Sequence, residues 1–244
     1  MKILLVQIRK DKMKEHEYDC FLAGLGLEKE ELVSYDMFGK KTISPADVKG
    51  YDAVIIGGSG DYSAYNEEGL EFLGELKAFM NHCLTVNIPV LGVCFGMQLA
   101  AAAFAGEVIE DNEQKEAGVF KIFLTEQGSQ NSIFEGLSDS FDAVIGHMDC
   151  VSRLPENAVL LAYSKKCPIQ AFTFPNKNFY MFQFHSELSK EGMLERLRFY
   201  FNKGYAKQEE IDDISNNAPL VTEPMRILKN FKKIVEENAK KRPL

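Results

Sequence analysis

The spacings typical of structural zinc sites do not occur in this sequence, although it has five cysteines and four histidines. No two cysteines are arranged as Cys-x-x-Cys, and no two histidines as His-x-x-x-His. We therefore expect no metal site, and we expect no cofactor. The cysteines are odd in number and irregularly spaced, which favours free thiols in a reducing compartment over a disulfide framework.

Long apolar runs are missing as well. None approaches the roughly 20 residues of a membrane-spanning helix. The apolar part of residues 1–12 is too short for a signal peptide, and no small-residue cleavage site follows it. We therefore expect a cytoplasmic protein that does not contact membranes. Positive charge is in deficit, because the formal net charge is −8 at pH 7, and this disfavours a nucleic-acid partner.

Apolar runs bounded by turn residues predict the strands. They cover residues 3–8, 31–35, 53–56, 90–93, 119–124, 141–145, 159–163, 170–173 and 179–184. Helical patterns fill 67–83 and 95–105 between the early strands, and 186–201 after the last one. Apolar strands that alternate with helices predict an α/β fold, with a mostly parallel sheet covered on both faces. The strand-rich stretch 119–184 predicts an added antiparallel β section.

We expect one main domain over residues 1–201, with residues 202–244 packed on it. The stretch 202–220 is polar and predicts a linking loop. A C-terminal helix follows, and its apolar stripe is formed by Met225, Leu228, Phe231 and Val235. A homodimer contact through this segment is an open alternative.

The stretch GVCFG at 92–96 lies where a strand pattern gives way to a helix pattern. A sharp strand-to-helix turn has no room for side chains two positions either side of its apex, and Gly92 and Gly96 supply that room. The apex residue, Cys94, then stands at the carboxyl end of the sheet and at a helix N-terminus, which favours an anion. The pattern predicts a nucleophilic thiol, with the Phe95 N–H directed at an oxyanion.

A nucleophile needs a base, and the base needs an acceptor that orients it. His185 follows the predicted strand 179–184, and Glu187 lies two residues further on. One local turn can therefore bring the carboxylate to the imidazole. A single histidine after a strand is more often a surface residue, but His-x-Glu downstream of the cysteine turn predicts a triad of Cys94, His185 and Glu187.

The glycine-rich stretch GGSGDYS at 57–63 ends another apolar strand, so we expect it at the same edge of the sheet. Its glycine amides are candidates for a second oxyanion donor. A phosphate-binding loop is the competing interpretation, but the pattern G-x-x-x-x-G-K-S/T that it requires is absent.

Four ordered blocks of the sequence together resemble the class I, or triad, glutamine amidotransferases, especially the amidotransferase domain of GMP synthase and its free-standing relatives. The blocks are GGSGDYS at 57–63, GVCFGMQ at 92–98, GHMDCV at 146–151 and FQFHSE at 182–187. The resemblance covers roughly residues 45–190. It implies a flavodoxin-like fold and hydrolysis of the γ-amide of glutamine.

The resemblance also implies a role for each matching residue. Cys94 would be the nucleophile, His185 the general acid and base, and Glu187 the partner that orients the imidazole. Gly58 and Phe95 would provide the N–H groups of the oxyanion hole.

The implied substrate contacts are Gln98, which would touch the bound glutamine, and His147 and Asp149, whose block lies near it. Two positions depart from the family pattern. Ser186 stands where proline is usual between the histidine and the glutamate, and Met148 stands where glycine is usual in the third block. The first change loosens the turn but keeps both catalytic groups, and the second bears on how the substrate fits.

No Ser-Gly-Gly-x-Asp-Ser nucleotide loop occurs in the 244 residues, so an ammonia acceptor half is not recognisable. The first functional hypothesis is a free-standing glutamine amidotransferase that passes ammonia to a synthase partner subunit. A γ-glutamyl peptidase or hydrolase that acts on γ-glutamyl peptides or conjugates is an alternative. A non-catalytic regulatory module of the same fold is another, although the complete Cys–His–Glu set argues against it.

Overall fold

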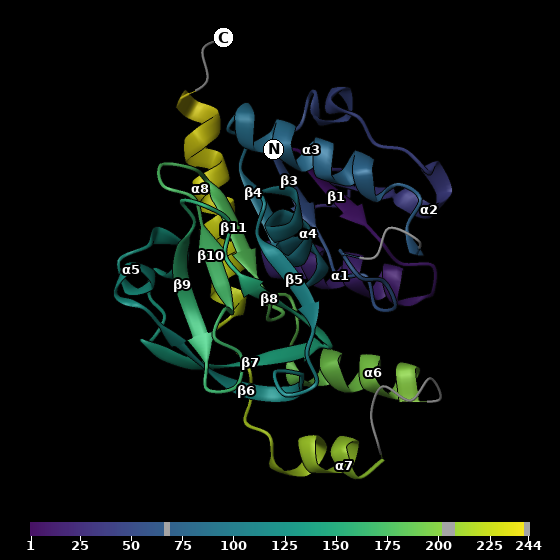
Figure 1. The fold of residues 1–244 in the computed structure, drawn as a ribbon, viewed down its shortest axis with the longest axis vertical. Helices are drawn as coiled ribbons and strands as arrows, with labels where there is room; N and C mark the ends of the chain where they lie inside the picture. Colours follow the sequence, from purple (N-terminus) through teal and green to yellow (C-terminus); the bar gives the residue numbers. More distant parts are fainter. Residues whose placement is uncertain (66–68, 202–207, 242–244) are drawn as a thin grey trace.

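A computed structural model describes residues 1–65, 69–201 and 208–241 (Figure 1). Its strands are β1 (Ile3–Gln7), β2 (Leu32–Asp36), β3 (Ala53–Ile56), β4 (Val90–Val93), β5 (Glu107–Glu110), β6 (Glu116–Leu124), β7 (Ser140–His147), β8 (Asp149–Arg153), β9 (Val159–Ser164), β10 (Ala171–Thr173) and β11 (Phe179–Phe182). Its α-helices are α1 (Met13–Leu25), α2 (Met37–Lys40), α3 (Leu73–Thr85), α4 (Phe95–Ala103), α5 (Glu126–Ser129), α6 (Lys190–Tyr200), α7 (Gln208–Asn217) and α8 (Met225–Lys241). Two short 3-10 helices are η1 (Pro45–Val48) and η3 (Ser132–Phe134).

The main sheet has nine strands in the order β2-β1-β3-β4-β11-β10-β9-β6-β7. Strands β2, β1, β3, β4 and β11 are parallel, and β10, β9, β6 and β7 continue the sheet by antiparallel pairing. Every residue of β1, β3, β4 and β11 is buried, as expected for parallel strands with helices on both faces. The carboxyl ends of these four strands share one edge, so the loops that follow them lie close together.

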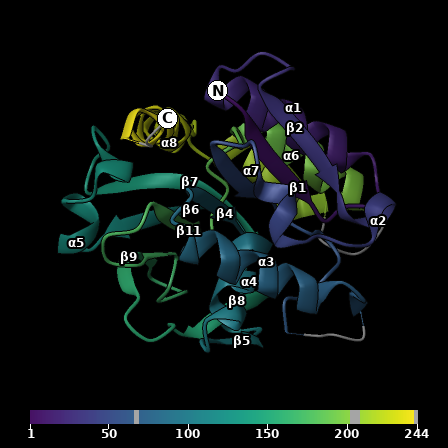
Figure 2. The same ribbon diagram turned by 90° about the horizontal axis from the view of Figure 1, so that it is seen from above.

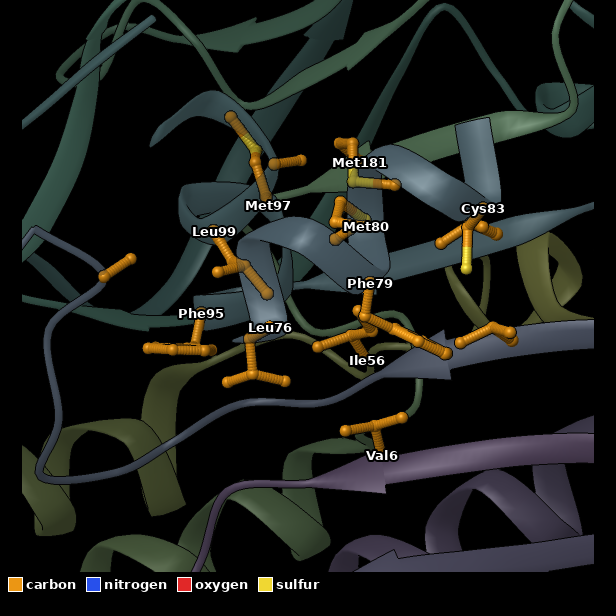
Figure 3. Packing of buried hydrophobic residues seen from close by; sticks show 14 of the residues in the cluster. Val6, Ile56, Leu76, Phe79, Met80, Cys83, Phe95, Met97, Leu99 and Met181 are labelled. Atoms are coloured by element: carbon orange, nitrogen blue, oxygen red, sulfur yellow. The ribbon is translucent and has the colours of Figure 1, made fainter. Parts of the chain in front are cut away.

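Helices cover the two faces of the sheet in pairs. Along β1, Leu4 and Val6 belong to the core beneath α3 and α4, whereas Ile3 and Leu5 belong to the core beneath α1 and α8. Figure 2 shows these pairs of helices on opposite sides of the sheet. Figure 3 shows the first core, where strand residues meet the side chains of α3 and α4, among them Val6, Ile56, Leu76, Phe79, Met97 and Leu99.

The observed architecture confirms the expected α/β class, with a parallel core, an antiparallel section and a C-terminal helix. Helix α1 and the separate two-stranded sheet of β5 and β8 were not predicted. The inner face of α1 carries Met13, Glu17, Phe21 and Leu25, all buried, so a buried glutamate interrupts its apolar stripe. That interruption hides the helical periodicity.

The expectation of a loop over 202–220 is wrong for residues 208–217, which form α7. Ile211 and Ile214 are buried against residues of α6 and β7, and this packing supports a helix that is otherwise polar. Residues 202–207 lie outside the described part of the chain. Helix α8 lies beside α1, and the division of the chain at residue 201 stays a prediction. None of the helices in the described ranges is both long and apolar enough to cross a membrane.

Candidate active site

The turn from β4 into α4 holds Cys94 in a strained backbone conformation. Its φ is 53° and its ψ is −103°, a combination that residues with a Cβ rarely adopt. A Cβ on Gly92 would lie 2.6 Å from Met181 Sδ, and a Cβ on Gly96 would collide with the carbonyl oxygen of Ile56. The turn therefore requires both glycines, as the sequence pattern predicts.

The Cys94 side chain is half-buried and lines a cavity of about 260 Å³. The cavity walls come from the loop after β3, from the end of β7 with the start of β8, and from α6. Five of the sequence-predicted site residues line this cavity, namely Cys94, Gln98, His147, Asp149 and His185. The other three, Gly58, Phe95 and Glu187, do not line it.

The expected Cys–His–Glu residues are in contact. Strand β11 pairs directly with β4, so His185, just past the end of β11, comes close to Cys94. The His185 N–H donates to the carbonyl of Val144 at 2.8 Å, and the imidazole forms a hydrogen bond with the Cys94 thiol. Its Nδ1 lies 2.8 Å from Glu187 Oε1, across the local turn that the sequence predicts.

The charges of these groups depend strongly on one another. Burial acts to lower the pKa of His185, but the Glu187 charge and hydrogen bonds to Cys94 and Glu187 outweigh it and raise the pKa to about 9. Burial acts to raise the pKa of Glu187, but His185 and Arg196 lower it to about 2. At neutral pH the imidazole is therefore protonated and the carboxylate is ionised.

Arg196 on α6 is a member of the site that the sequence reasoning missed. Its Nη1 donates to Glu187 Oε1 at 3.1 Å and lies 3.3 Å from His185 Nδ1. Its Nε donates to His16 Nδ1 at 3.3 Å, and burial, together with the charge of Arg196, lowers the pKa of His16. The signal was present in the sequence, because an arginine four residues before Tyr200 occupies the buried stripe of the predicted helix.

The Gly58 N–H does not point where the sequence reasoning expects. It donates to Oε1 of the buried Glu17 on α1 at 3.0 Å. That carboxylate also accepts from Arg9 Nε at 3.0 Å, and Arg9 Nη1 donates to the Tyr200 hydroxyl at 3.1 Å. Gly58 nevertheless lies beside the imidazole, because a Cβ on it would be 3.5 Å from His185 Cε1. In this conformation its N–H is bonded to Glu17 and is not directed at an oxyanion on Cys94.

The expected substrate contacts differ in how free their side chains are. Gln98 Nε2 donates to the backbone carbonyl of Asp149 at 2.9 Å and lies 3.2 Å from Gln183 Oε1. The side chain of His147 is buried, with Nε2 3.2 Å from Glu116 Oε2. The side chains of Gln98 and His147 therefore bond to the protein itself, which leaves Asp149 as the predicted contact with a carboxylate at the cavity.

This arrangement fits acyl transfer. A thiol stands at a helix N-terminus, and a protonated imidazole beside it is held by a buried carboxylate. Phe95 is the first residue of α4, so its N–H has no acceptor within that helix and can stabilise negative charge next to Cys94. A carbonyl carbon brought to the thiol would thus meet a nucleophile, a proton donor and an oxyanion donor.

The family model for class-I glutamine amidotransferases matches residues 25–203 of this chain. One of the separate subunits of a GMP synthase (glutamine-hydrolyzing), from Methanosphaera stadtmanae, is 37% identical over 123 residues, which are 49% of this chain and 60% of that protein. GMP synthase (glutamine-hydrolyzing) from Lactobacillus acidophilus is 34% identical over 158 residues, which are 65% of this chain and 28% of that protein. The chain thus spans less than two thirds of either relative.

Solved structures show the same fold over nearly the whole chain. A glutamine amidotransferase from Thermotoga maritima superposes with a TM-score of 0.75 at 20% identity and covers 96% of this chain and 98% of its own. A glutamine amidotransferase from Methylobacillus flagellatus gives a TM-score of 0.71 at 20% identity and covers 98% and 94%.

Proposed function

Because the chain belongs to the class-I glutamine amidotransferase family, we propose that it hydrolyses the γ-amide of glutamine through a γ-glutamyl thioester on Cys94. One observation carries this proposal. The Cys94 thiol, the His185 imidazole and the Glu187 carboxylate are in contact, and the first two line one cavity. A thiol, a base and an orienting acceptor are the minimum set for this chemistry.

In the first half-reaction the Cys94 thiolate attacks the γ-carbonyl carbon of glutamine. The carbonyl electrons move to oxygen, and the Phe95 N–H stabilises the resulting oxyanion. The C–N bond then breaks, and the departing nitrogen takes a proton and leaves as ammonia. His185 can supply that proton at neutral pH, because its raised pKa of about 9 keeps it charged.

In the second half-reaction water cleaves the thioester. His185, now neutral, accepts a proton from the water as it attacks the carbonyl carbon, and glutamate leaves as the C–S bond breaks. Glu187 stabilises the imidazolium that forms again, and it remains ionised because its own pKa is about 2. The same histidine therefore acts as acid and then as base.

We propose that Gly58 becomes the second oxyanion donor only after its peptide turns away from Glu17. Its N–H and the Arg9 guanidinium share the Glu17 carboxylate, so the turn would break the bond at Gly58 and leave the Arg9 bond in place. Arg9 also bonds to Tyr200 at the end of α6, which connects this loop to a helix that lines the cavity. Movement of α6 is thus a physical route to the turned peptide.

We propose that Asp149 binds the α-ammonium group of glutamine. Burial raises its pKa, a hydrogen bond from Ser63 acts in the opposite direction, and Glu110 adds a second negative charge nearby. All three residues line the cavity, so a cation placed there would be attracted by two carboxyl groups. Replacing Asp149 with asparagine is expected to raise KM for glutamine more than it lowers kcat.

Ammonia made at Cys94 needs an acceptor, and we propose that a separate synthase protein receives it. Support comes from the relative in Methanosphaera stadtmanae, which is named as one subunit of a GMP synthase. Met148 lines the cavity and is 40% exposed, so it offers this partner an apolar contact beside the site. This residue takes the place of the glycine that the family pattern has here.

The test is the steady-state release of glutamate by the reduced protein. Glutamine and a panel of γ-glutamyl dipeptides would be compared, each with and without the organism's synthase partner. We expect glutamine to be the best substrate and the partner to accelerate its hydrolysis. Preference for a γ-glutamyl dipeptide would favour the peptidase alternative. No turnover of any compound, with a thiol that still alkylates, would favour a non-catalytic module.

A further inference from the structure

A second group of metal-binding side chains lies buried beside the cavity. Glu116 at the start of β6, His147 at the end of β7 and Cys167 between β9 and β10 each offer a ligand atom, and these atoms lie within 4.8 Å of one another. All three residues are buried. Cys150 on β8, which is also fully buried, hydrogen-bonds to Cys167 through its thiol. Two thiols, an imidazole and a carboxylate therefore converge from four parts of the chain.

The register of the sheet explains how residues distant in sequence meet here. Glu116 and His147 are opposite each other in the antiparallel pairing of β6 and β7. Their ligand atoms, Oε2 and Nε2, are 3.2 Å apart. Ligands of a tetrahedral zinc ion lie roughly 3.3–3.8 Å from one another, given bonds of about 2.0–2.3 Å. The spacing in this cluster is therefore close to that of a formed site.

The carboxylate is also oriented in the way that metal ligands usually are. Ser164 Oγ donates to Glu116 Oε1 at 2.7 Å, and Gln170 Nε2 donates to Oε2 at 2.6 Å. The Cys167 N–H donates to Ser164 Oγ at 2.9 Å, so one hydroxyl ties a thiol-bearing residue to the carboxylate. Such outer partners fix ligand geometry in metal sites.

Hydrogen bonds within the protein do not satisfy this cluster completely. Among the described residues, His147 Nδ1 and Gln170 Oε1 are buried and have no hydrogen-bond partner. The Cys167 thiol has only a long contact, 3.7 Å, to the carbonyl of Ile169 besides its bond to Cys150. An unpaired ring nitrogen next to two thiols is a feature that a bound cation would explain.

We propose that Glu116, His147, Cys150 and Cys167 bind one Zn²⁺ ion in a closed, four-ligand structural site. Sulfur and nitrogen donors select zinc over calcium and magnesium, and burial leaves no position for a catalytic water. On binding, the two thiols release their protons to solvent, and the imidazole nitrogen that coordinates gives up any proton it carries. The ion fixes the corner between β7 and β8, whose Gly146 and Asp149 line the cavity.

The experiment is a titration of metal-free, reduced Cys94→Ser protein with Co²⁺, followed by displacement with Zn²⁺. The Cys94→Ser change removes the catalytic thiol as a competing ligand. We expect one equivalent of Co²⁺ to bind with the thiolate-to-cobalt charge-transfer band and tetrahedral d–d bands, and Zn²⁺ to abolish both. Adding Cys167→Ser is expected to remove the charge-transfer intensity of one thiolate and to weaken binding by more than about 100-fold.

Matched variants keep the test decisive if Cys167→Ser unfolds. Ser164→Ala keeps all four ligands and is expected to weaken binding by about 10–100-fold, as loss of an outer partner does. Cys83→Ser removes another buried cysteine, on α3, and is expected to leave the titration unchanged. The proposal is overturned if Cys94→Ser protein shows no thiolate–cobalt band. It is also overturned if Ser164→Ala and Cys83→Ser behave alike, or if Cys150 and Cys167 alkylate equally fast with and without Zn²⁺.

Discussion

Two clusters in this chain are built from the same three residue types, and their surroundings give them different chemistry. They are the cavity cluster of Cys94, His185 and Glu187, and the buried cluster of Cys167, His147 and Glu116. In the cavity cluster the thiol and the imidazole border an open space. In the buried cluster all three residues are buried. Access for a substrate, rather than residue identity, therefore separates a catalytic site from a structural one.

The backbone and the charges differ between the clusters as well. Cys94 sits in a strained turn at the start of a helix, where the free amides favour an anion. Cys167 sits in a loop whose own N–H bonds to Ser164. Glu187 has a cationic partner in Arg196, whereas Glu116 accepts from the neutral side chains of Ser164 and Gln170. Only the cavity cluster has the electrostatic setting that a nucleophile needs.

The largest expected effect is the loss of the cavity thiol. Cys94→Ala is expected to reduce kcat for glutamine by on the order of 10⁴-fold or more, because no other group can form the thioester. The matched change Cys167→Ala removes the other thiol and is expected to keep kcat within about tenfold. Steady-state glutamate release measures both. A Cys94→Ala protein with a tenth of the original activity would contradict the comparison.

The histidine and the glutamate of the cavity cluster come next. His185→Asn is expected to be nearly as damaging as Cys94→Ala, because the imidazole moves protons in both half-reactions. Glu187→Gln is expected to be milder, since the carboxylate only orients and stabilises the imidazolium. Glu116→Gln serves as the control in the buried cluster and is expected to affect KM rather than kcat. If Glu187→Gln were more severe than His185→Asn in folded protein, the assigned roles would be wrong.

Arg196 is expected to give a smaller effect on rate. It shares Glu187 Oε1 with His185, so its removal loosens the carboxylate without removing a reacting group. A hydrogen bond to a charged group contributes about 1.5–3 kcal/mol. Arg196→Met is therefore expected to lower kcat by about tenfold to 100-fold with little change in KM, and Arg196→Lys by less. An unchanged kcat in Arg196→Met would show that Arg196 does not position Glu187.

The smallest expected effect is on stability as a function of pH. His185 has a folded pKa of about 9, above its unfolded value of about 6.5, so its contribution is complete below pH ~6.5 and is lost as the pH rises through 9. Glu187 has a folded pKa of about 2, below its unfolded value of about 4.3, so its contribution is present above pH ~4.3 and is lost as the pH falls toward 2.

Measuring Tm from acid to alkaline pH tests this coupling. The original protein is expected to show a plateau between these windows and a decline on either side. Glu187→Gln removes the charge that raises the pKa of His185, so its decline between pH ~6.5 and 9 is expected to be shallower. Equal slopes in both proteins over that range would mean that Glu187 does not stabilise the charged imidazole.

Sequence reasoning succeeded where the site depends on strand ends. The contact of Cys94 with His185 and the turn to Glu187 follow from two parallel strands that end at one edge, and the apolar pattern reveals both strands. The glycines around Cys94 follow from the turn itself. These features are local in sequence, or they follow from the rule that parallel strands share an edge.

Sequence reasoning failed where the site depends on helix packing. The direction of the Gly58 N–H is set by Glu17 on α1, a helix that the pattern did not reveal because that same glutamate interrupts its apolar stripe. Arg196 reaches Glu187 only because α6 packs over the end of β11. The cluster around Glu116 depends on strand register, which spacing rules for zinc motifs do not consider.

The central claim is that Cys94, alone among the five cysteines, attacks a γ-glutamyl carbonyl. Its most direct test is intact-mass analysis and peptide mapping of the reduced protein after brief treatment with a diazoketone analogue of glutamine. We predict a single adduct on Cys94, slowed by excess glutamine and strongly reduced in His185→Asn, with Cys150 and Cys167 unmodified. An adduct that forms first on another cysteine, or at an equal rate in His185→Asn, would contradict the account.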